Sequence, residues 1–387
     1  MGDDRRRHNL HEIAIVGTGY VADLYMRSLK AFPAIKVTAA FDINSQRLRE
    51  FCAYWSVPAA ESLDELLDNR HGAARLILNL TNPESHYAVS ERCLKAGKHV
   101  YSEKPLAMDM DAAYALHALA EKENLLLASA PCSLLGETAQ TVWLALRQDR
   151  IGKPHLVYAE LDDDYIPQAP YHQWRSESGA PWPYRNEFSV GCTLEHAGYY
   201  LTWLIAMFGP VQQVVSASAT LVENKLEDDA PTAPDFSCAT LFLSSNVVAR
   251  LTCSIVAPRN HKLLVVGERG TLQVGECWDN NAKVQLRRRY RVRHRLITSP
   301  VASRVRIAGP THEKVRRRGA AAMNFALGPA ELLAALTEQR SPRLNAHLAL
   351  HLNEVTLAIQ NPKASSGATI MQTSCPRIDP MPWARGN

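Results

Sequence analysis

The stretch Glu12–Phe32, EIAIVGTGYVADLYMRSLKAF, decides the fold of the first part of this 387-residue chain. Residues 13–16 form a short apolar run rich in β-branched side chains, as expected of a buried strand. Residues 17–22, GTGYVA, then follow the pattern G-x-G-x-x-A and open a helical pattern. The first glycine permits a tight turn, the second lets a pyrophosphate approach the backbone, and the alanine allows close helix–strand packing. The helix N-terminus presents free N–H groups to the anion, so the stretch predicts a dinucleotide site.

A second strand, IKVTAAFD, ends in Asp42, 25 residues after Gly17. That spacing is close to the roughly 20 residues expected for the acid that binds the cofactor ribose. A carboxylate at this place accepts hydrogen bonds from the ribose hydroxyls and repels a 2′-phosphate, and Ile43 offers that phosphate no cation. Arg47, one helical turn later, argues for NADP, although such an arginine more often lies over the adenine or in solvent. We favour NAD over NADP.

A third unit comprises a helix near 62–69, the strand ARLILNLT and a helix from 86 to 96, followed by KHVYSEKP at 98–105. Alternating strands and helices of this length predict a doubly wound parallel sheet. Ligands bind such sheets beyond the carboxyl ends of the strands. Thr81-Asn82 and Glu103-Lys104-Pro105 both follow strands, so we expect the charged pair to lie where a nicotinamide binds.

Composition excludes several classes of protein. The chain is 46% hydrophobic and 21% charged with a formal charge of +4, which is ordinary for a globular protein and indicates no nucleic-acid partner. No apolar run reaches the roughly 18 residues that span a bilayer, and the first 12 residues lack an apolar signal core. The eight cysteines contain no C-x-x-C pair. We therefore expect structural thiols, no metal site and a cytoplasmic location.

From about residue 151 several segments alternate like strands, and residues 191–210, GCTLEHAGYYLTWLIAMFGP, have a helical period with a Gly-Pro stop. We predict a Rossmann domain over residues 1–130 and a domain for substrate binding and oligomerisation over 131–387. In the helix, Glu195, Tyr199 and Thr202 fall on one stripe. Polar groups on an apolar helix need partners or water, although a buried helix with tolerated polar residues is the simpler alternative.

Two further segments have open interpretations. The loop 162–187 contains Trp174 and Arg175 among other aromatic and basic side chains, which suit a sugar or pack on one another. The segment 286–296, LRRRYRVRHRL, puts four arginines on one face of a predicted strand, at 289, 291, 293 and 295. We favour a solvated or oligomer-facing surface there over a nucleic-acid site.

Residues 17–22, Asp42, LTNPESH at 80–86 and AGKHVYSEKPLA at 96–107 resemble the Gfo/Idh/MocA family of oxidoreductases, which includes glucose-fructose oxidoreductase and inositol dehydrogenase. The last of these segments is the most specific. The resemblance implies α/β architecture: a Rossmann domain joined to an α/β domain with a large, open, mostly antiparallel sheet. It also implies a nicotinamide cofactor and a sugar, inositol or related cyclic polyol as substrate. The lysine of the family's E-K-P motif corresponds to Lys104, so the resemblance implies that Lys104 touches cofactor and substrate.

The family's second motif, D-x-G-x-H-x-x-D, is altered here. Aligned on Gly209, this chain has Glu195, Ala197, Tyr199 and Thr202, so a tyrosine stands in place of the catalytic histidine. In this it is similar to some sugar-nucleotide ketoreductases of the family, which use a tyrosine as proton donor. We favour Tyr199 over His196, because His196 points about 100° round the helix from Glu195. The cation of Lys104 would favour the phenolate of Tyr199.

These inferences predict an NAD-dependent dehydrogenase or ketoreductase that acts on a sugar or cyclic polyol as a homodimer or homotetramer. The alternatives are redox-assisted glycoside cleavage and a non-catalytic NAD-binding regulatory protein. The predicted cofactor contacts are Gly17, Gly19, Tyr20, Val21, Ala22, Asp42, Ile43, Arg47, Thr81, Asn82, His86, Glu103 and Lys104. The predicted substrate contacts are Lys104, Trp174, Arg175, Glu195 and Tyr199, and the catalytic candidates are Lys104, Tyr199, Glu195 and His196.

Overall fold

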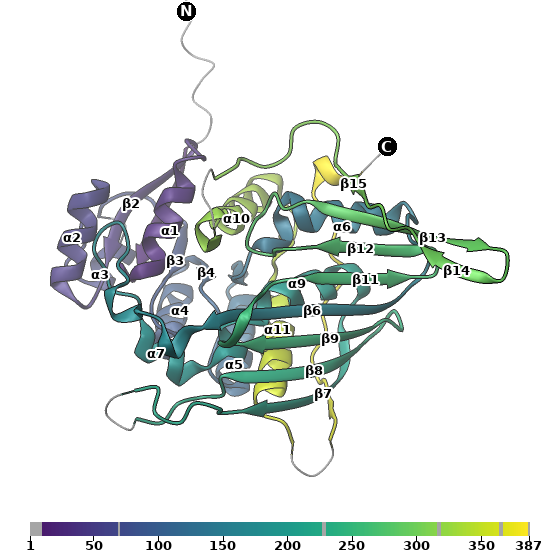
Figure 1. Ribbon diagram of the computed structural model, residues 1–387. Helices are drawn as coiled ribbons and strands as arrows, with labels where there is room; N and C mark the ends of the chain where they lie inside the picture. The colour runs from purple at the N-terminus through teal and green to yellow at the C-terminus, as the bar shows by residue number, and fades with distance from the viewer. Residues whose placement is uncertain (1–9, 69, 227–229, 316–318, 364–366, 386–387) are drawn as a thin grey trace, which may run out of the picture. The chain divides into compact units, whose positions relative to one another are not determined.

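The computed structural model describes residues 10–68, 70–226, 230–315, 319–363 and 367–385 (Figure 1). The predicted absence of a signal core concerns residues that lie mostly outside these ranges. The chain divides into two compact units. Unit 1 comprises Met1–Ala130, Pro170–Asn186 and Phe325–Leu350, and unit 2 comprises Pro131–Ala169, Glu187–Asn324 and His351–Asn387. The assignment of cofactor binding to residues 1–130 and substrate binding to 131–387 stays a prediction.

Unit 1 is built on a five-stranded sheet with the order β2-β1-β3-β4-β5, and its parallel pairing confirms the predicted doubly wound parallel sheet (Figure 1). The strand order reverses between β1 and β3, and in doubly wound sheets ligands bind at the carboxyl ends beside that switch point. The strands are β1 (His11–Val16), β2 (Ile35–Phe41), β3 (Leu76–Asn79), β4 (His99–Ser102) and β5 (Leu127–Ser129). The helices are α1 (Tyr20–Leu29), α2 (Ser45–Trp55), α3 (Leu63–Leu67), α4 (His86–Lys95), α5 (Met110–Lys122) and α10 (Leu327–Glu338).

Alternate residues of β4 face two different layers of the unit. Val100 joins a buried apolar cluster that includes Leu94 of α4, Leu116 of α5 and Leu350. Tyr101 lies on the other face, where its ring meets the ring of Tyr25 of α1 at 6.2 Å. The sheet is thus covered on both faces, which explains why its strands are continuous apolar runs.

Unit 2 is built on an 11-stranded sheet with the path β14-β13-β12-β11-β6-β9-β8-β7-β16, where β10 pairs with β6 and β15 with β13. The pairing is antiparallel except between β6 and β9, so the predicted large, mostly antiparallel sheet is confirmed. The strands are β6 (Pro154–Tyr165), β7 (Val211–Ala219), β8 (Phe236–Leu243), β9 (Val248–Ser254), β10 (Val256–Asn260), β11 (Leu263–Gly267), β12 (Gly270–Val274), β13 (Val284–Val292), β14 (Arg295–Thr298), β15 (Ser303–Val305) and β16 (Thr369–Ile370).

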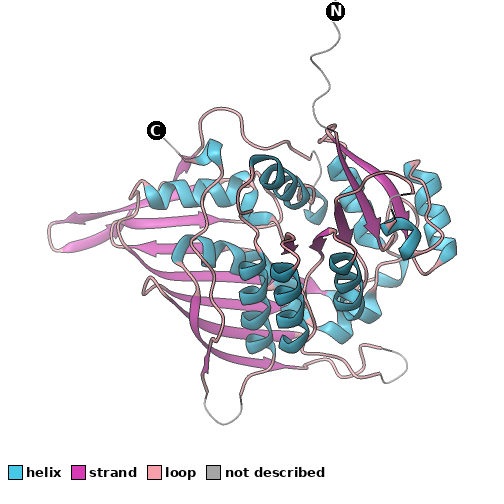
Figure 2. Ribbon diagram, turned by 180° about the vertical axis from the view of Figure 1, so that it is seen from behind, coloured by secondary structure: helices cyan, strands magenta, loops and turns pink. Residues whose placement is uncertain are grey.

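The helices of unit 2 lie over one face of this sheet (Figure 2). They include α6 (Glu137–Arg147), α8 (Cys192–His196), α9 (Gly198–Phe208) and most of α11 (Ala346–Gln360), while α7 (Tyr184–Val190) begins in unit 1. Short 3-10 turns occur at Pro83–Ser85, Ser133–Leu135, Ile166–Gln168, Tyr171–Gln173, Gly319–Ala322 and Pro382–Ala384. No helix of this unit's described residues lies over the opposite face, which carries half-exposed apolar side chains such as Leu156, Val215 and Phe242.

The prediction that four arginines share one face of a single strand is wrong. The segment 286–296 turns back on itself, because β13 and β14 form a hairpin in which Val292 pairs with Arg295. Arg293 adopts a positive φ of 52° at the turn, which places it outside both strands. The turn was missed because it contains no glycine, asparagine or aspartate, the residues that usually mark a two-residue hairpin loop.

Two other expectations can be compared with the structure. All eight cysteines are free thiols, and six of them are buried, as structural thiols are expected to be. Among the described residues, no helix is both long enough and apolar enough to cross a bilayer.

Candidate active site

The turn between β1 and α1, residues 17–19, requires glycine at its first position; we call this turn the glycine cradle. Gly17 has a φ of +93°, and its N–H donates to the carbonyl of Phe41 at 2.8 Å. A Cβ on Gly17 would lie 2.6 Å from the carbonyl carbon and oxygen of Leu80, at the end of the neighbouring strand. A Cβ on Gly19 would meet nothing within 4 Å, so the space above the second glycine is open. This geometry fits a pyrophosphate placed on the N-terminus of α1, where Tyr20 and Val21 are half-buried.

Asp42 directly follows β2 and is buried, with both carboxylate oxygens bonded to protein donors. Its Oδ2 accepts from the backbone N–H and the hydroxyl of Thr18 at 2.7 and 3.0 Å, and from Nε of Arg47 at 3.0 Å. Its Oδ1 accepts from the N–H of Asn44 at 2.8 Å and from a second Arg47 nitrogen at 2.6 Å. Burial opposes ionisation, but these hydrogen bonds outweigh it and hold the pKa of Asp42 below its usual value. Ile43, next in the chain, is 91% exposed.

The loops after β3 and β4 are joined by a buried histidine. His86, the first residue of α4, is fully buried, and its Nδ1 lies 2.6 Å from the carbonyl oxygen of Pro105. Its Nε2 lies 2.9 Å from the carbonyl oxygen of Thr81. Asn79 accepts from the hydroxyl of Thr81 at 2.7 Å and donates to the carbonyl of His86 at 3.0 Å. His86 was predicted as a cofactor contact; its ring bonds to the protein itself, so we propose that it positions the loops.

Glu103 is held at the end of β4 by partners on two elements. Its Oε1 accepts from the phenol of Tyr25 on α1 at 2.6 Å, and its Oε2 accepts from the backbone N–H of Lys104 at 3.2 Å. Its own N–H donates to the carbonyl of Asn79 at 2.8 Å. The backbone of Lys104 is therefore fixed on both sides, by the Glu103 carboxylate and by Pro105.

In unit 2 the predicted helix over 191–210 is two helices, α8 and α9, which meet at Ala197. The backbone of Ala197 remains helical, so Glu195, His196 and Tyr199 keep nearly their predicted angular order. Thr202 does not need an external partner, because its hydroxyl donates to the carbonyl of Gly198 at 3.1 Å. Glu195 and Tyr199 are both buried, at 5% and 8% exposure.

His196 and Tyr199 pack against the same indole. The ring of Trp278 lies 5.9 Å from the ring of His196 and 5.7 Å from that of Tyr199. The guanidinium of Arg259 lies 4.8 Å from the centre of that indole. The rotation that separates His196 from Glu195 thus places His196 against the same indole as Tyr199, which the sequence did not indicate.

Charged side chains surround this indole. Arg259 donates to Asp163 at 2.7 Å and to Glu276 at 2.8 Å, and His261 contacts Glu276 at 2.8 Å. His196 Nε2 lies 3.9 Å from Asp163. We call the set Asp163, His196, Tyr199, Arg259, His261, Glu276 and Trp278 the Trp278 cluster.

The two acids of the Trp278 cluster differ in their affinity for protons. Burial opposes ionisation of Glu276, but hydrogen bonds from His261, Trp278 and Arg259 outweigh it and lower its pKa to about 2. Burial raises the pKa of Asp163 and outweighs the attraction of His261 and Arg259. Because Arg259 donates to both acids, this difference reflects burial and the number of donors rather than the presence of a cation.

The aromatic segment 170–186 lies in unit 1, and its rings pack on one another. The ring of Trp174 lies 5.1 Å from that of Trp182, and the ring of Tyr171 lies 5.1 Å from that of Tyr184. Arg175 donates to the carbonyls of His172 and Trp174, both at 2.9 Å. Internal packing, one of the two interpretations of this loop, therefore describes its structure, while substrate contact by Trp174 and Arg175 stays a prediction.

Sequence reasoning missed Tyr25, Trp278 and Arg259. Tyr25 follows Ala22 at i+3 on α1, so it lies on the face that packs against the sheet, and that spacing could have suggested a role. Trp278 and Arg259 lie in segments without a motif, and we find no signal in the sequence that could have identified them.

Comparison with known families gives two matches. A model described as the Gfo/Idh/MocA oxidoreductase family, NAD-binding Rossmann fold, matches residues 11–130. A model of the Gfo/Idh/MocA C-terminal domain matches residues 139–273.

Among curated proteins, the chain is 24% identical over 274 residues to an uncharacterised oxidoreductase of Synechocystis, covering 68% of this chain and 71% of that protein. It is 26% identical over 160 residues to myo-inositol 2-dehydrogenase of Thermotoga maritima, covering 41% and 47%. It is 28% identical over 155 residues to UDP-N-acetylglucosamine 3-dehydrogenase of Acidithiobacillus ferrooxidans, covering 40% and 46%. The matches thus span about half the length of the latter two enzymes.

Solved structures share the fold at low sequence identity. The WlbA dehydrogenase of Bordetella pertussis, in complex with NADH and UDP-GlcNAcA, has a TM-score of 0.69 at 18% identity, covering 93% of this chain and 98% of that one. A 3-ketoreductase of Actinomadura kijaniata, in complex with TDP-benzene and NADP, has a TM-score of 0.69 at 19% identity, covering 91% and 98%. Relatives of this fold are therefore found with either cofactor.

Substitution of Gly17 and substitution of Gly19 are expected to have different effects, the first on stability and the second on cofactor binding. Gly17→Ala should lower the thermal unfolding midpoint, because a positive φ and the contact with Leu80 cost about 1–3 kcal/mol. Gly19→Ala should leave that midpoint unchanged, because its Cβ meets no protein atom, but should weaken NADH binding at least about tenfold by blocking the pyrophosphate. Thermal unfolding and NADH fluorescence titration measure both effects. Wild-type NADH affinity in Gly19→Ala would place the cofactor elsewhere.

Proposed function

Because the chain belongs to the Gfo/Idh/MocA family of oxidoreductases, we propose that it transfers a hydride to or from a hydroxyl or keto carbon of a sugar, sugar derivative or cyclic polyol, with NAD(H) as cofactor. The observation that carries this proposal is the fixed Lys104 at the end of β4, in the same parallel sheet as the open glycine cradle. The names of the inositol and UDP-N-acetylglucosamine dehydrogenases among the relatives support the substrate class.

The residues of unit 1 have separable roles in this proposal. The nicotinamide cofactor, when bound, gives or takes the hydride. Lys104 directs its ammonium at the reacting oxygen of the substrate, and the Tyr25–Glu103 contact fixes the backbone from which the lysine extends. A positioned cation stabilises the negative charge that develops on that oxygen.

Tyr199 of unit 2 supplies and removes the proton of the substrate oxygen. A phenol with an ordinary pKa near 10 is a weak partner at neutral pH, and a lysine cation close to it favours the phenolate. The neighbouring Trp278 packs edge-on against the Tyr199 ring and restricts its orientation. Lys104 and Tyr199 belong to different units, so their pairing rests on chemistry and on the family's motifs.

Trp278 is also proposed to bind the substrate. Its indole Nε1 is buried and has no hydrogen-bond partner among the described residues. A buried donor left unpaired costs about 1–3 kcal/mol, so this nitrogen needs a water or a ligand hydroxyl. A polyol offers such an acceptor beside Tyr199.

We predict that NADH binds more tightly than NADPH, because Asp42 carries a negative charge where a 2′-phosphate would lie. Arg47 now occupies the carboxylate edge that a ribose diol would use. Arg47→Ala should therefore leave NADH affinity equal or higher and should weaken NADPH, since the nearby cation is lost. A hydrogen bond to a charged group contributes about 1.5–3 kcal/mol, so the affinity of Arg47→Ala for NADPH should be lower than that of the wild type by about tenfold or more. Calorimetric titration of both proteins with both cofactors measures this, and tighter binding of NADPH by the wild type would contradict the assignment.

We predict that Lys104→Met and Tyr199→Phe each lower kcat on the order of 10²-fold or more, the scale of one positioned acid–base group. Both variants should still bind NADH, because the cradle and Asp42 lie elsewhere in the chain. The double variant should be little slower than either single one, since the two groups act as a unit. Steady-state rates on a panel of sugars, nucleotide sugars and polyols, followed by NADH absorbance, provide the measurement.

Two further variants test the assignment on the helix. His196→Gln should be far milder than Tyr199→Phe. Tyr200→Phe removes the neighbouring phenol, whose hydroxyl donates to the carbonyl of His261 at 2.5 Å, so it should lower stability and spare turnover. An inactive His196→Gln with an active Tyr199→Phe would move the proton-transfer role to His196. Full activity in Lys104→Met and Tyr199→Phe would place the chemistry outside these residues.

We predict a homodimer or homotetramer formed through the open face of the 11-stranded sheet, since such a face exposes more apolar surface than monomers usually tolerate. Phe242, 38% exposed on β8, and Leu156, 39% exposed on β6, flank Val248 in the strand register. Phe242→Glu should therefore yield a monomer. Leu221→Glu, which changes a 60% exposed leucine after β7, should keep the assembly. Light scattering decides, and a monomeric wild type at micromolar concentration would refute the prediction.

A further inference from the structure

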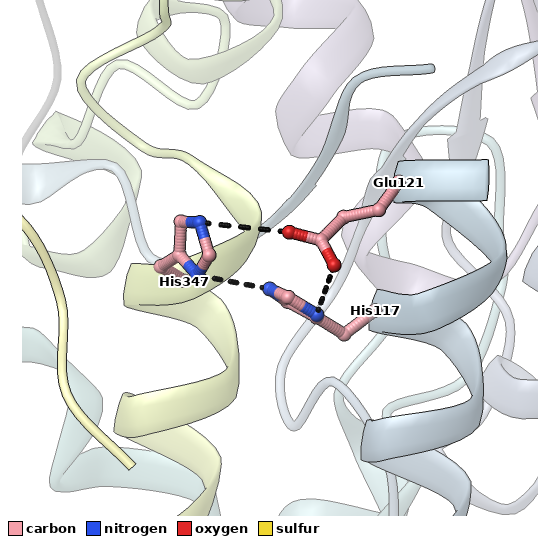
Figure 3. Close-up of side chains that lie close together, drawn as sticks. All are labelled: His117, Glu121 and His347. Carbon is pink, nitrogen blue, oxygen red and sulfur yellow. Dashed lines mark hydrogen bonds and ion pairs between the residues drawn. The ribbon is translucent and has the colours of Figure 1, made fainter. Parts of the chain in front are cut away.

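Two histidines and a glutamate from helices far apart in the sequence meet on unit 1 (Figure 3). His117 and Glu121 lie one turn apart on α5, and His347 lies in the first turn of α11. His117 Nε2 is 3.0 Å from His347 Nδ1. Glu121 bridges the outer sides of both rings, 3.5 Å from His117 Nδ1 and 3.8 Å from His347 Nε2. The three side chains form a closed triangle of nitrogen and oxygen atoms.

The two helices that carry this triangle are held together by apolar packing beneath it. Leu116 and Ala120 of α5 belong to the same buried cluster as Ala349 and Leu350 of α11. The side chain of His117 is 12% exposed, whereas those of Glu121 and His347 are 58% and 49% exposed. The backbone positions are therefore set by the core, and the outer side of the triangle is accessible to solvent.

The spacing of the three side chains is compatible with a bound metal ion. One ligand atom from each of the three residues lies within 4.8 Å of the others. Zinc–nitrogen bonds of about 2.0–2.1 Å in a tetrahedral site separate two ligands by about 3.3 Å, so the imidazole nitrogens need to move apart only slightly. Without a metal, the two facing imidazole nitrogens share one proton in a single hydrogen bond, and the other nitrogen of each ring faces Glu121.

Charge also favours a cation at this place. Among the described residues, the ion pairs of Glu121 are with the two histidines and not with a lysine or arginine.

A second group of potential ligands, His261, Glu276 and Cys277 in unit 2, differs in this respect. There Arg259 already donates to Glu276 at 2.8 Å, so a metal would meet a guanidinium. Burial also raises the pKa of the Cys277 thiol well above its ordinary value, which disfavours the thiolate that metals require. The His117 triangle carries neither obstacle.

We propose that His117, Glu121 and His347 form a binding site for a divalent transition-metal ion of the zinc type, which cross-links α5 to the first turn of α11. Two imidazoles and one carboxylate are ligands that zinc prefers, and the exposed side leaves the fourth position to water. The site is independent of the hydride-transfer function, since none of its residues has a role there. The sequence predicted no metal site because Glu121 and His347 lie 226 positions apart.

The test uses the full-length protein stripped of metal with a chelator and titrated with ZnCl2 in a calorimeter. The wild type should bind one zinc ion per chain at this site. His347→Ala and Glu121→Gln should each weaken that binding at least about tenfold, the scale seen even for loss of outer-shell partners. His71→Ala is the matched control, because His71 also pairs with a glutamate of unit 1, Glu65, at 3.0 Å but has no second histidine. It should bind zinc as the wild type does.

Two further readouts separate a specific site from binding by the eight cysteines. Zinc should raise the thermal unfolding midpoint of the wild type and of His71→Ala, but not of His117→Ala/His347→Ala, because only the former gain a link between two helices. Co²⁺ should give a visible spectrum of nitrogen and oxygen ligation without a thiolate charge-transfer band. Unchanged zinc affinity in the double variant, or a thiolate band in the cobalt protein, would overturn the proposal.

Discussion

One buried imidazole holds together the two loops that carry the proposed site of unit 1. His86 contacts the carbonyl of Pro105 at 2.6 Å and that of Thr81 at 2.9 Å, so a single ring joins the loops that leave β3 and β4. Burial lowers the pKa of His86 and outweighs the opposing pull of the two carbonyls and of Glu103. A neutral ring donates to only one carbonyl at a time. His86 therefore holds the two loops together by close packing as well as by a hydrogen bond. The loop after β4 carries Glu103 and Lys104, so the contact with Pro105 helps to fix their backbone positions.

Much of unit 1 could be predicted because its signals are local. The apolar run, the glycine turn and the helical period of Glu12–Phe32 lie within about 20 residues, and each reflects a constraint on the backbone there. Asp42 was predicted at the end of the second strand and directly follows β2. Its bond with Arg47 was harder to predict, because the sequence gives the separation of the two residues but not the side-chain rotamer that closes the pair.

The contacts that sequence reasoning missed join residues far apart in the chain. Tyr25 reaches Glu103 across 78 positions, and His117 reaches His347 across 230. The Trp278 cluster draws its members from β6, α8, α9, β10, the link between β10 and β11, and the segment after β12, which no periodicity connects. The prediction of a single strand over residues 286–296 was wrong for a different reason. Arg293 adopts a left-handed backbone conformation, which sequence rules reserve for glycine and asparagine. Local rules describe elements well, whereas sites depend on how those elements meet.

The carboxylates of both units bear on the proposal that a phenol carries the proton of the reaction. Asp42 and Glu276 accept several hydrogen bonds each, and those bonds hold their pKa values low, so neither binds a proton near neutral pH. Asp163 differs, because burial raises its pKa and His196 Nε2 lies 3.9 Å away. His196 and Tyr199 both pack against the ring of Trp278, at 5.9 and 5.7 Å. In the proposed reaction the hydrogen-bonded carboxylates Asp42 and Glu276 therefore hold no proton to give, and the proton is assigned to Tyr199, with His196 as the alternative on the same indole.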